Sequence, residues 1–236
     1  IKRSIDKLFV IFPFEKNYYS EKHKMETLYF GHPLIEVINS YKSNTSFFKK
    51  NNIPSNKPVV AFLPGSRIQE IKTMLPIFLS IISNYPNYNF IIAGVNNVNP
   101  KLYDLGSHPN LFIVYNKTYD LLTNSFAAIV TSGTASLECS LFKVPQIVCY
   151  KTSFLSFFVG KLFVKIRHIS LVNIILEKDI IKELIQDDLN KQNLIYEFNK
   201  LCKEEKRLKI IQEYSKIYDL LTVKDTTKKI ASSIFS

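Results

Sequence analysis

The sequence predicts an α/β fold in which a Rossmann-like parallel sheet carries helices on both faces. Short apolar runs alternate with helix-like segments up to residue 150, and the connections between them are short. Uninterrupted apolar runs are typical of parallel strands, because helices bury both faces of such a sheet. Ligands of this fold class bind beyond the carboxyl ends of the strands.

Strands are expected wherever Val, Ile, Leu, Phe and Ala form a short continuous run. These runs lie at residues 8–12, 27–30, 59–63, 89–94, 111–115, 127–131 and 146–150. Helices are expected at residues 15–22, 68–84, 118–124 and 135–142, with one or two more between residues 203 and 236. The closing helices carry an apolar stripe that includes Leu208, Ile211 and Ile217. The stretch 41–57, rich in Asn, Ser and Lys, is expected to be mostly loop.

The composition is that of a globular protein with an anionic partner. With 236 residues, of which 46% are hydrophobic and 22% charged, the chain can bury a proper core. Its formal net charge of +11 suggests a phosphorylated substrate, an acidic membrane surface or nucleic acid. The lysines are spread along the chain without a basic stripe or a recognition motif, which argues against nucleic acid.

The cysteines and the apolar runs restrict the compartment. The three cysteines lie far apart without metal-ligand spacing, so we expect neither a disulfide framework nor a zinc site. A reducing cytoplasm fits this pattern best. No apolar run reaches the length of a membrane span, and no signal peptide is visible.

The first candidate binding element is the turn Leu63-Pro64-Gly65-Ser66-Arg67, which joins the expected strand 59–63 to the next helix. The first amides of such a helix have no intrahelical partner and lie at the positive end of its dipole, so they can hold an anion. Arg67 adds a planar, bidentate donor. An ordinary turn with Ser66 as N-cap is the alternative. The chain has only four arginines and six glycines, so Gly65 and Arg67 both belong to residue types that are rare in this sequence.

The second candidate element follows the expected strand 127–131. Gly133 allows a ligand to approach the backbone, and the hydroxyls of Ser132 and Thr134 can donate to phosphate. Ala135 begins the expected helix, and Glu138, one turn further, can accept bonds from a ribose diol. For Glu138 the alternative is a carboxylate favoured only by the helix dipole.

A strongly apolar segment follows the strand 146–150. Phe154, Phe157 and Phe158 lie in it together with Lys161 and Lys165, two lysines on one helical face. This pattern suits a bilayer surface, and equally a core helix with solvated lysines.

Taken together, the motifs resemble the bacterial lipid-A-disaccharide synthases, and the resemblance extends over nearly the whole chain. The matching residues, in order, are 12–16, 30–34, 63–67 with 70–71, 132–135 with 137–139, 143–145, 169–171 with 173, and 182–186. One departure lies at Leu171-Val172-Asn173, where the family usually has Leu-Pro-Asn. Another lies at Leu176-Glu177, where the family usually has Ala-Gly.

The resemblance implies a two-domain glycosyltransferase of the B type, of which this chain is mainly the donor-binding half. Residues 1–31 would be the end of the N-terminal acceptor-side domain, 32–205 the C-terminal UDP-sugar domain, and 206–236 helices that return towards the N-terminal half. The general base would precede Ile1. The implied reaction transfers 2,3-diacylglucosamine from its UDP donor to 2,3-diacylglucosamine 1-phosphate with inversion and release of UDP. No cofactor is expected, and the absence of an Asp-x-Asp pair favours a metal-independent mechanism.

The resemblance also implies roles for individual residues. Arg67 would stabilise the leaving group. The UDP-sugar would be bound by Pro64, Gly65, Ser66, Arg67, Ser132, Gly133, Thr134, Ala135, Glu138, Tyr150 and Asn173. The implied location is the cytoplasmic face of the inner membrane, to which the protein would bind peripherally.

Two other functions remain open. One is a different UDP-sugar enzyme on the same fold, such as a UDP-N-acetylglucosamine 2-epimerase or a related N-acetylglucosaminyltransferase. The other is a non-catalytic basic fragment that binds nucleotides or membranes.

Overall fold

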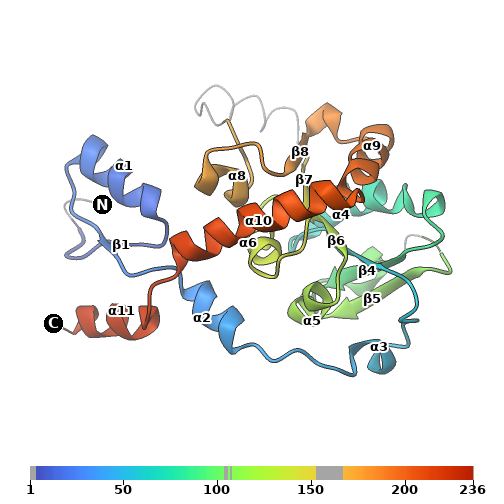
Figure 1. Ribbon diagram of the computed structural model, residues 1–236, viewed down its shortest axis with the longest axis horizontal. Coiled ribbons are helices and arrows are strands. Elements are labelled where there is room, and N and C mark those ends of the chain that lie inside the picture. Colours follow the sequence, from blue (N-terminus) through green and yellow to red (C-terminus); the bar gives the residue numbers. More distant parts are fainter. Residues whose placement is uncertain (1–3, 104–105, 107, 153–166, 236) are drawn as a thin grey trace.

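The computed structural model describes residues 4–103, 106, 108–152 and 167–235, and its main body is a parallel sheet covered by helices (Figure 1). The sheet has six strands in the order β5-β4-β3-β6-β7-β8, all parallel. Its strands are β3 (Val59–Leu63), β4 (Asn89–Gly94), β5 (Leu111–Tyr115), β6 (Ala127–Thr131), β7 (Gln146–Tyr150) and β8 (Lys182–Ile185). The Rossmann-like architecture predicted from the sequence is therefore confirmed, and β3 to β7 have the expected bounds.

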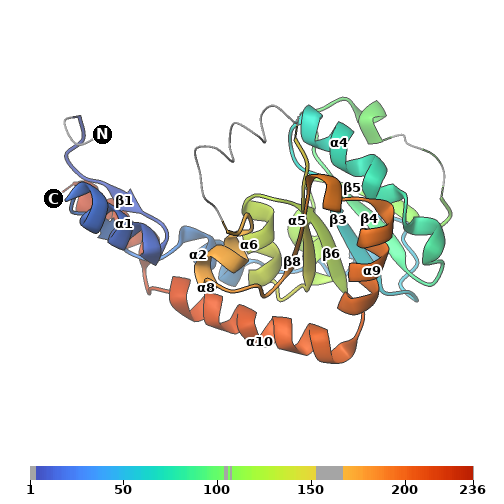
Figure 2. The ribbon, with the colours of Figure 1, turned by 90° about the horizontal axis from the view of Figure 1, so that it is seen from above.

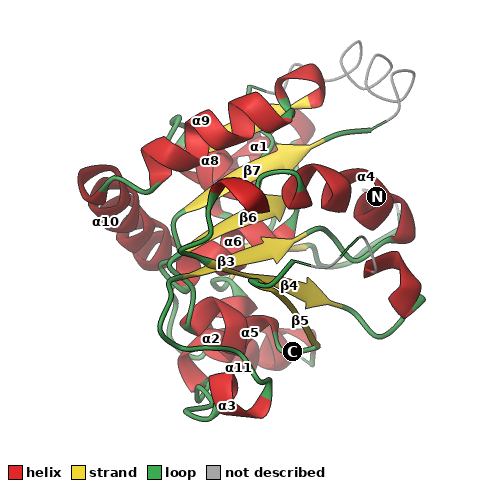
Figure 3. Cartoon of the chain, turned by 90° about the vertical axis from the view of Figure 1, so that its right-hand side faces the viewer, coloured by secondary structure: helices red, strands yellow, loops and turns green. Residues whose placement is uncertain are grey.

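Helices cover both faces of this sheet. One face carries α4 (Ile68–Leu79) and α9 (Lys191–Leu201), as the view from above shows (Figure 2). The other face carries α5 (Thr118–Thr123), α6 (Thr134–Leu141) and α8 (Leu171–Leu176), and α10 (Glu204–Leu221) crosses beyond the amino ends of the strands (Figure 2 and Figure 3). The expected helix 68–84 ends at Leu79, and a separate 3-10 turn follows at Ile82–Asn84.

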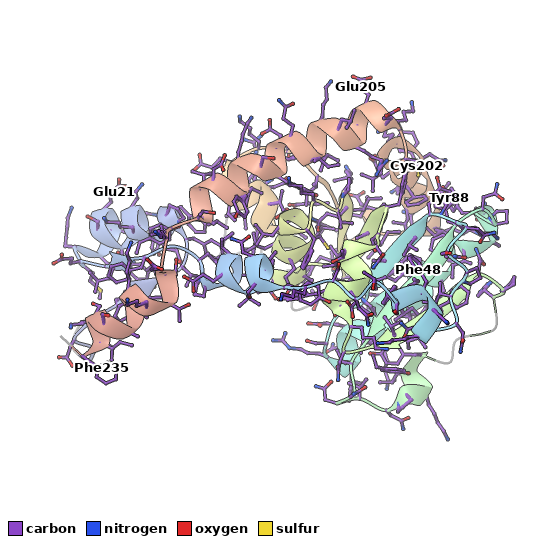
Figure 4. All side chains as sticks on the ribbon, turned by 60° about the horizontal axis from the view of Figure 1, so that its bottom comes forward. Glu21, Phe48, Tyr88, Cys202, Glu205 and Phe235 are labelled. Atoms are coloured by element: carbon purple, nitrogen blue, oxygen red, sulfur yellow. The ribbon has the colours of Figure 1, made fainter. Side chains whose placement is uncertain are left out.

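The core lies between these layers. Every residue of β3, β4 and β6 is buried, as the continuous apolar runs predicted. The Phe62 ring lies 5.0 Å from that of Phe90 and 5.5 Å from that of Phe78, which joins β3, β4 and α4. At the far side, the Tyr88 hydroxyl lies 3.6 Å from Cys202 Sγ, beside the junction of α9 and α10 (Figure 4).

The strand order places a topological switch between β3 and β6. From β3 the chain moves outwards to β4 and β5, and α5 then brings it back to the other side of β3 as β6. The strands end at one edge of the sheet, where their arrows point in Figure 3. Loops that follow adjacent strands at such a switch diverge and leave a crevice. The turn 64–67 follows β3, and the loop 132–133 follows β6.

A smaller unit lies to one side of the large sheet (Figure 1). Its two parallel strands, β1 (Phe9–Val10) and β2 (Leu28–Tyr29), are joined by α1 (Pro13–His23), and α11 (Thr226–Ile234) lies against it. Glu21 on α1 and Phe235 after α11 lie at the end of this unit that is remote from the large sheet (Figure 4).

Two chain crossings connect the small unit with α2 (Pro33–Ser40) and α10. They run side by side, because the His32 amide donates to the Leu221 carbonyl at 3.0 Å and the Tyr29 hydroxyl donates to the Leu220 carbonyl at 3.2 Å. Of the closing helices, α10 packs on α6 and α8 of the large sheet, and α11 is the one that returns to the small unit. The division of the chain at residues 31 and 205 stays a prediction.

The apolar pattern predicted no element between residues 168 and 203. There α8, β8 and α9 complete the sheet, and a 3-10 turn lies at Gln186–Asp188. The short helix α3 (Phe47–Lys50) interrupts the expected loop 41–57. The candidate membrane residues Phe154, Phe157, Phe158, Lys161 and Lys165 lie outside the described residues. Within the described ranges, no helix is long and apolar enough to cross a bilayer.

Candidate functional site

A cavity of about 410 Å³ lies at the switch point, between the turn after β3 and the loop after β6. Eight of the predicted site residues line it, namely Gly65, Ser66, Arg67, Ser132, Gly133, Thr134, Ala135 and Glu138. Its other lining residues are Leu63, Glu70, Ala93, Val95, Thr118 and Thr131. The structure thus brings together two motifs that lie more than sixty residues apart in the sequence.

The first turn is closed by a carboxylate of the chain itself. Oε2 of Glu70 accepts hydrogen bonds from the amides of Ser66 (3.1 Å) and Arg67 (3.3 Å). Oε1 of the same carboxylate accepts from Nη1 of Arg67 at 3.3 Å. The N-cap of α4 is therefore Arg67 and not Ser66, and the two amides that Glu70 accepts from lie just before the first helical residue, Ile68.

Gly65 is what allows this carboxylate to fold back onto the turn. Its φ is +106°, a conformation that residues with a side chain rarely adopt. A Cβ at this position would also collide with the carboxylate and the Cβ of Glu70. The glycine therefore makes room for Glu70 and not for a ligand.

The second loop is open towards the cavity. Gly133 has φ +154° and ψ −162°, a region of the backbone map that only glycine occupies readily. A Cβ built on it would have no protein atom within 4 Å, so this glycine leaves free space beside the helix N-terminus. No side chain of the described residues caps α6. The positive N-terminal end of α6 therefore lies at the cavity without a side-chain cap among the described residues.

Ser132 uses both its hydroxyl and its amide in hydrogen bonds within the protein. Its hydroxyl donates to the carbonyl of Ile169 at 2.9 Å, and its amide donates to the carbonyl of Cys149 at 2.9 Å. In this structure Ser132 fixes the loop, whereas Thr134 is exposed at the start of α6. The expected role of the Ser132 hydroxyl as a phosphate donor is therefore not supported by its geometry.

Glu138 lies half-buried on the first turns of α6 and faces the cavity. Its Oε1 accepts a hydrogen bond of 3.0 Å from the hydroxyl of Tyr119 on α5. Burial raises the pKa of the Glu138 carboxyl, and the bond from Tyr119 opposes that rise. The pKa of Tyr119 is raised to about 12, first by burial and then by the neighbouring Glu138. No local sequence pattern indicates Tyr119, because its contact with Glu138 joins two helices.

The structure does not bring Asn173 to the cavity. Its side chain is only 1% exposed and makes four hydrogen bonds inside the protein. Nδ2 donates to the Ile181 carbonyl and to Oε1 of Glu183, both at 2.9 Å, and Oδ1 accepts from the amides of Ile180 (2.9 Å) and Ile181 (3.1 Å). Asn173 therefore joins α8 to β8 here, and all its bonding capacity is used.

Glu183 is the centre of this polar cluster. It accepts from the amides of Ile169 and Ser170, both at 3.0 Å, and from the Ser170 hydroxyl at 2.6 Å. The same segment provides the Ile169 carbonyl that holds Ser132. The motifs around residues 169–173 and 182–186 thus hold the segment that fixes Ser132 in the cavity lining.

Two further predicted contacts also lie apart from the cavity lining. Pro64 is buried in the turn, and Tyr150 is half-buried at the end of β7. Among the described residues, no group of three His, Cys, Asp or Glu side chains could hold a metal ion. Asp187 and Asp188 lie exposed on the 3-10 turn after β8.

Comparison with known proteins decides the family. The family described as lipid-A-disaccharide synthetase matches residues 1–234. The chain belongs to this family. The resemblance predicted from the motifs is therefore confirmed.

Two curated members of the lipid-A-disaccharide synthase family illustrate the match. The protein from Francisella philomiragia is 32% identical over 245 residues, which cover 98% of this chain and 63% of the relative. The protein from Sulfurihydrogenibium sp. is 36% identical over 211 residues, which cover 80% of this chain and 54% of the relative. The chain thus spans less than two thirds of the length of these family members.

Solved structures share the fold of this family member at low identity. A putative UDP-N-acetylglucosamine 2-epimerase from Listeria monocytogenes has a TM-score of 0.61 at 16% identity, over 88% of this chain and 54% of that one. A glycosyltransferase involved in lipopolysaccharide biosynthesis has a TM-score of 0.55 at 13% identity, over 95% and 62%. The UDP-N-acetylglucosamine 2-epimerase of Neisseria meningitidis, solved with UDP-N-acetylglucosamine bound, has a TM-score of 0.54 at 17% identity, over 89% and 55%. The chain therefore has the fold of one half of a B-type glycosyltransferase.

Proposed function

We propose that this chain is the donor-binding half of an enzyme that makes the lipid A disaccharide. The donor is UDP-2,3-diacylglucosamine, the acceptor is 2,3-diacylglucosamine 1-phosphate, and UDP is released. The observation that carries the proposal is the cavity at the switch point, where Arg67, the open N-terminus of α6 and the Glu138 carboxylate converge. Family membership supplies the choice of reaction.

The donor fits this cavity with its diphosphate towards α6 and its ribose towards Glu138. The amides of Thr134 and Ala135, which have no hydrogen-bond partner among the described residues, and the positive end of the α6 dipole favour an anion beside Gly133. Arg67 reaches the same space from the opposite side and is 84% exposed, so its guanidinium is accessible to a phosphate. Glu138 keeps one carboxylate oxygen for the hydroxyls of the ribose.

The reaction we propose is an inverting displacement without a metal ion. The acceptor hydroxyl attacks the anomeric carbon, the bond to the diphosphate breaks, and negative charge develops on the leaving UDP. Arg67 and the α6 N-terminus stabilise that charge, because both are in place before the reaction begins. We assign the general base to the half of the longer family members that this chain does not match.

In the longer enzyme, Arg67→Ala is expected to reduce the transfer rate about 100- to 1,000-fold, the usual loss for one preorganised donor. The fold should be unaffected, because the Arg67 side chain is exposed. Near-normal turnover of the variant would remove Arg67 from the mechanism.

A UDP-sugar epimerase is the second candidate, since two of the solved structures with this fold carry that name. The two functions differ in their products. Incubation of the longer enzyme with two acylated monosaccharide substrates gives a disaccharide and UDP in one case, and an epimerised nucleotide sugar in the other.

The acylated substrates lead us to propose peripheral binding to the cytoplasmic face of the inner membrane. The residues proposed for this contact are Phe154, Phe157, Phe158, Lys161 and Lys165. Co-sedimentation with anionic liposomes should weaken when Phe157 and Phe158 are both changed to serine. Unchanged co-sedimentation would remove this segment from the membrane contact.

The decisive experiment for the donor site is a titration of the purified chain with UDP, followed by thermal unfolding. A ligand that binds the folded chain raises its stability by about 2.7 kcal/mol at 100 times the dissociation constant. Arg67→Ala should reduce the shift, whereas Lys72→Ala, an exposed cation on α4 outside the cavity lining, should not. No shift of the wild-type chain at millimolar UDP would overturn the donor-site proposal.

A further inference from the structure

One carboxylate organises the whole turn that presents Arg67. Glu70 accepts three hydrogen bonds, of 3.1 and 3.3 Å from the amides of Ser66 and Arg67 and of 3.3 Å from the Arg67 guanidinium. Its side chain is 30% exposed and lines the cavity, whereas that of Arg67 is 84% exposed. The chain therefore places a negative charge at the rim of a cavity that we propose for a doubly anionic ligand.

An acidic residue at this place would normally weaken the binding of an anion. Here the carboxylate oxygens are divided between two tasks. Oε2 pairs with both backbone amides, and Oε1 pairs with Nη1 of Arg67. A guanidinium has five N–H donors, so the remaining ones stay available to a ligand.

We propose that Glu70 is a positioning residue of the donor site, which acts on the diphosphate through Arg67. The inference rests on the proposed function. A free arginine side chain on the surface loses considerable rotamer entropy when it binds a phosphate. Glu70 reduces this cost because it restrains the guanidinium at the cavity rim before the donor arrives. The amides of Ser66 and Arg67, just before α4, are not available to the ligand, since Glu70 occupies them.

Gly65 belongs to the same arrangement. The side chain of Glu70 can approach the turn only because position 65 has no Cβ. The Gly-Ser-Arg motif and the glutamate three residues after Arg67 therefore form one structural unit. Gly65 makes room for the Glu70 carboxylate, Glu70 pairs with the two amides and with Arg67, and Arg67 contacts the diphosphate.

The test is a double-mutant cycle on UDP affinity, measured by calorimetry with the purified chain. Glu70→Gln keeps a carbonyl oxygen for the two amides and replaces the oxygen that faces Arg67 by an amide group. UDP should bind about two- to fivefold more weakly, the effect of one exposed ion pair. In the Arg67→Ala background, the same Glu70→Gln change should have no further effect, because the group on which it acts is gone. The preference for UDP over uridine should fall with each single variant.

The matched control is Glu197→Gln on α9. It breaks an ion pair of the same spacing, from Lys200 Nζ to Glu197 Oε1 at 3.2 Å, outside the cavity lining. UDP affinity should not change. Tighter UDP binding by Glu70→Gln would overturn the inference, because it would mean that the carboxylate competes with the diphosphate. An equal loss in both backgrounds would overturn it too, because Glu70 would then act independently of Arg67. Failure of the wild-type chain to bind UDP would instead refute the proposed function.

Discussion

The hydroxyl of Tyr119 donates a hydrogen bond of 3.0 Å to Oε1 of Glu138, so one oxygen of this carboxylate is occupied before any ligand binds. The Tyr119 ring is held in turn by aromatic neighbours, with ring centres 5.4 Å from Tyr41 and 5.1 Å from Phe142. The second carboxylate oxygen has no hydrogen-bond partner among the described residues. Tyr119 thus fixes the direction in which Glu138 presents its free oxygen to the cavity.

Tyr119→Phe should weaken UDP binding about two- to tenfold, the cost of one hydrogen bond that orients a ligand contact. Binding of 2′-deoxy-UDP should fall less, since Glu138 has one ribose hydroxyl fewer to accept from. Calorimetry with both nucleotides measures the difference. Tyr214→Phe is the control, because the Tyr214 hydroxyl accepts from Gln146 Nε2 at 3.1 Å deep in the core and away from the cavity. If the two nucleotides lose affinity equally in Tyr119→Phe, the link between Tyr119 and ribose recognition fails.

Glu138→Gln should stabilise the empty protein at neutral pH while it weakens nucleotide binding. Burial raises the folded-state pKa of Glu138 above its ordinary value of 4.5, so the folded protein favours the protonated carboxyl. The contribution of Glu138 to stability is therefore complete below the unfolded-state pKa and is lost as the pH rises through the folded-state pKa. Glutamine does not ionise, so the variant does not lose this stability as the pH rises. Urea unfolding at pH 7 should show the variant to be more stable than wild type, and the advantage should vanish near pH 4. A variant less stable than wild type at pH 7 would contradict this account.

The strands were predictable from the sequence because burial on both faces leaves a local trace. Residues 59–63 and 127–131 are continuous apolar runs, and both became buried strands with these bounds. β8 left no such trace, because it is a short edge strand that includes Lys182 and Glu183. Edge strands tolerate charge, so an apolar criterion misses them.

The cavity lining was predictable from its two glycine motifs, whereas the bonds that hold it were not. The capping signal was present in the sequence as Glu70, but the usual Ser or Thr at the N-cap is replaced by Arg67, so the N-cap of the alternative reading, Ser66, lies one residue too early. The partners of Asn173 lie on β8 and in the two residues before it, and the partner of Glu138 lies on α5. Such contacts depend on tertiary packing, which spacing along the chain does not encode.

The two loop glycines should respond differently to alanine. Gly65→Ala places a residue with a Cβ at φ +106° and forces the Glu70 carboxylate away, so we expect strain and the loss of the capping bonds together. Gly133→Ala is strained as well, but its Cβ meets no protein atom within 4 Å. Backbone strain of this kind costs about 1–3 kcal/mol. The loss of stability should be larger for Gly65→Ala than for Gly133→Ala, because only Gly65→Ala adds a collision with Glu70.

Urea denaturation of the two glycine variants compares their stabilities, and a UDP titration of the folded fraction compares their sites. Gly133→Ala should abolish measurable UDP binding, because its methyl group enters the space beside the α6 N-terminus. Normal UDP affinity of folded Gly133→Ala would show that the diphosphate does not approach this glycine.

Asn173→Asp should destabilise the fold far more than its small change in shape suggests. The new oxygen would replace Nδ2, which donates at 2.9 Å both to the Ile181 carbonyl and to Glu183 Oε1. Two donor contacts thus become contacts between acceptors, one of them between two carboxylates. We expect a loss of roughly 3 kcal/mol at pH 7, typical of a buried polar group that loses its partner beside a like charge.

The pH dependence of this loss distinguishes charge from shape. The folded-state pKa of the introduced carboxyl should be raised by burial and by Glu183, so its protonated form is favoured and can donate again. The deficit relative to wild type should therefore shrink as the pH falls from 7 towards 4 in urea unfolding. Asn190→Asp is the matched control, because Asn190 is the exposed N-cap of α9, accepts from the Asn193 amide at 3.0 Å, and occupies a position where aspartate caps equally well. A deficit in Asn173→Asp that stays constant with pH would mean that the amide acts through its shape alone, and that the cluster around Glu183 does not depend on the donor of Asn173.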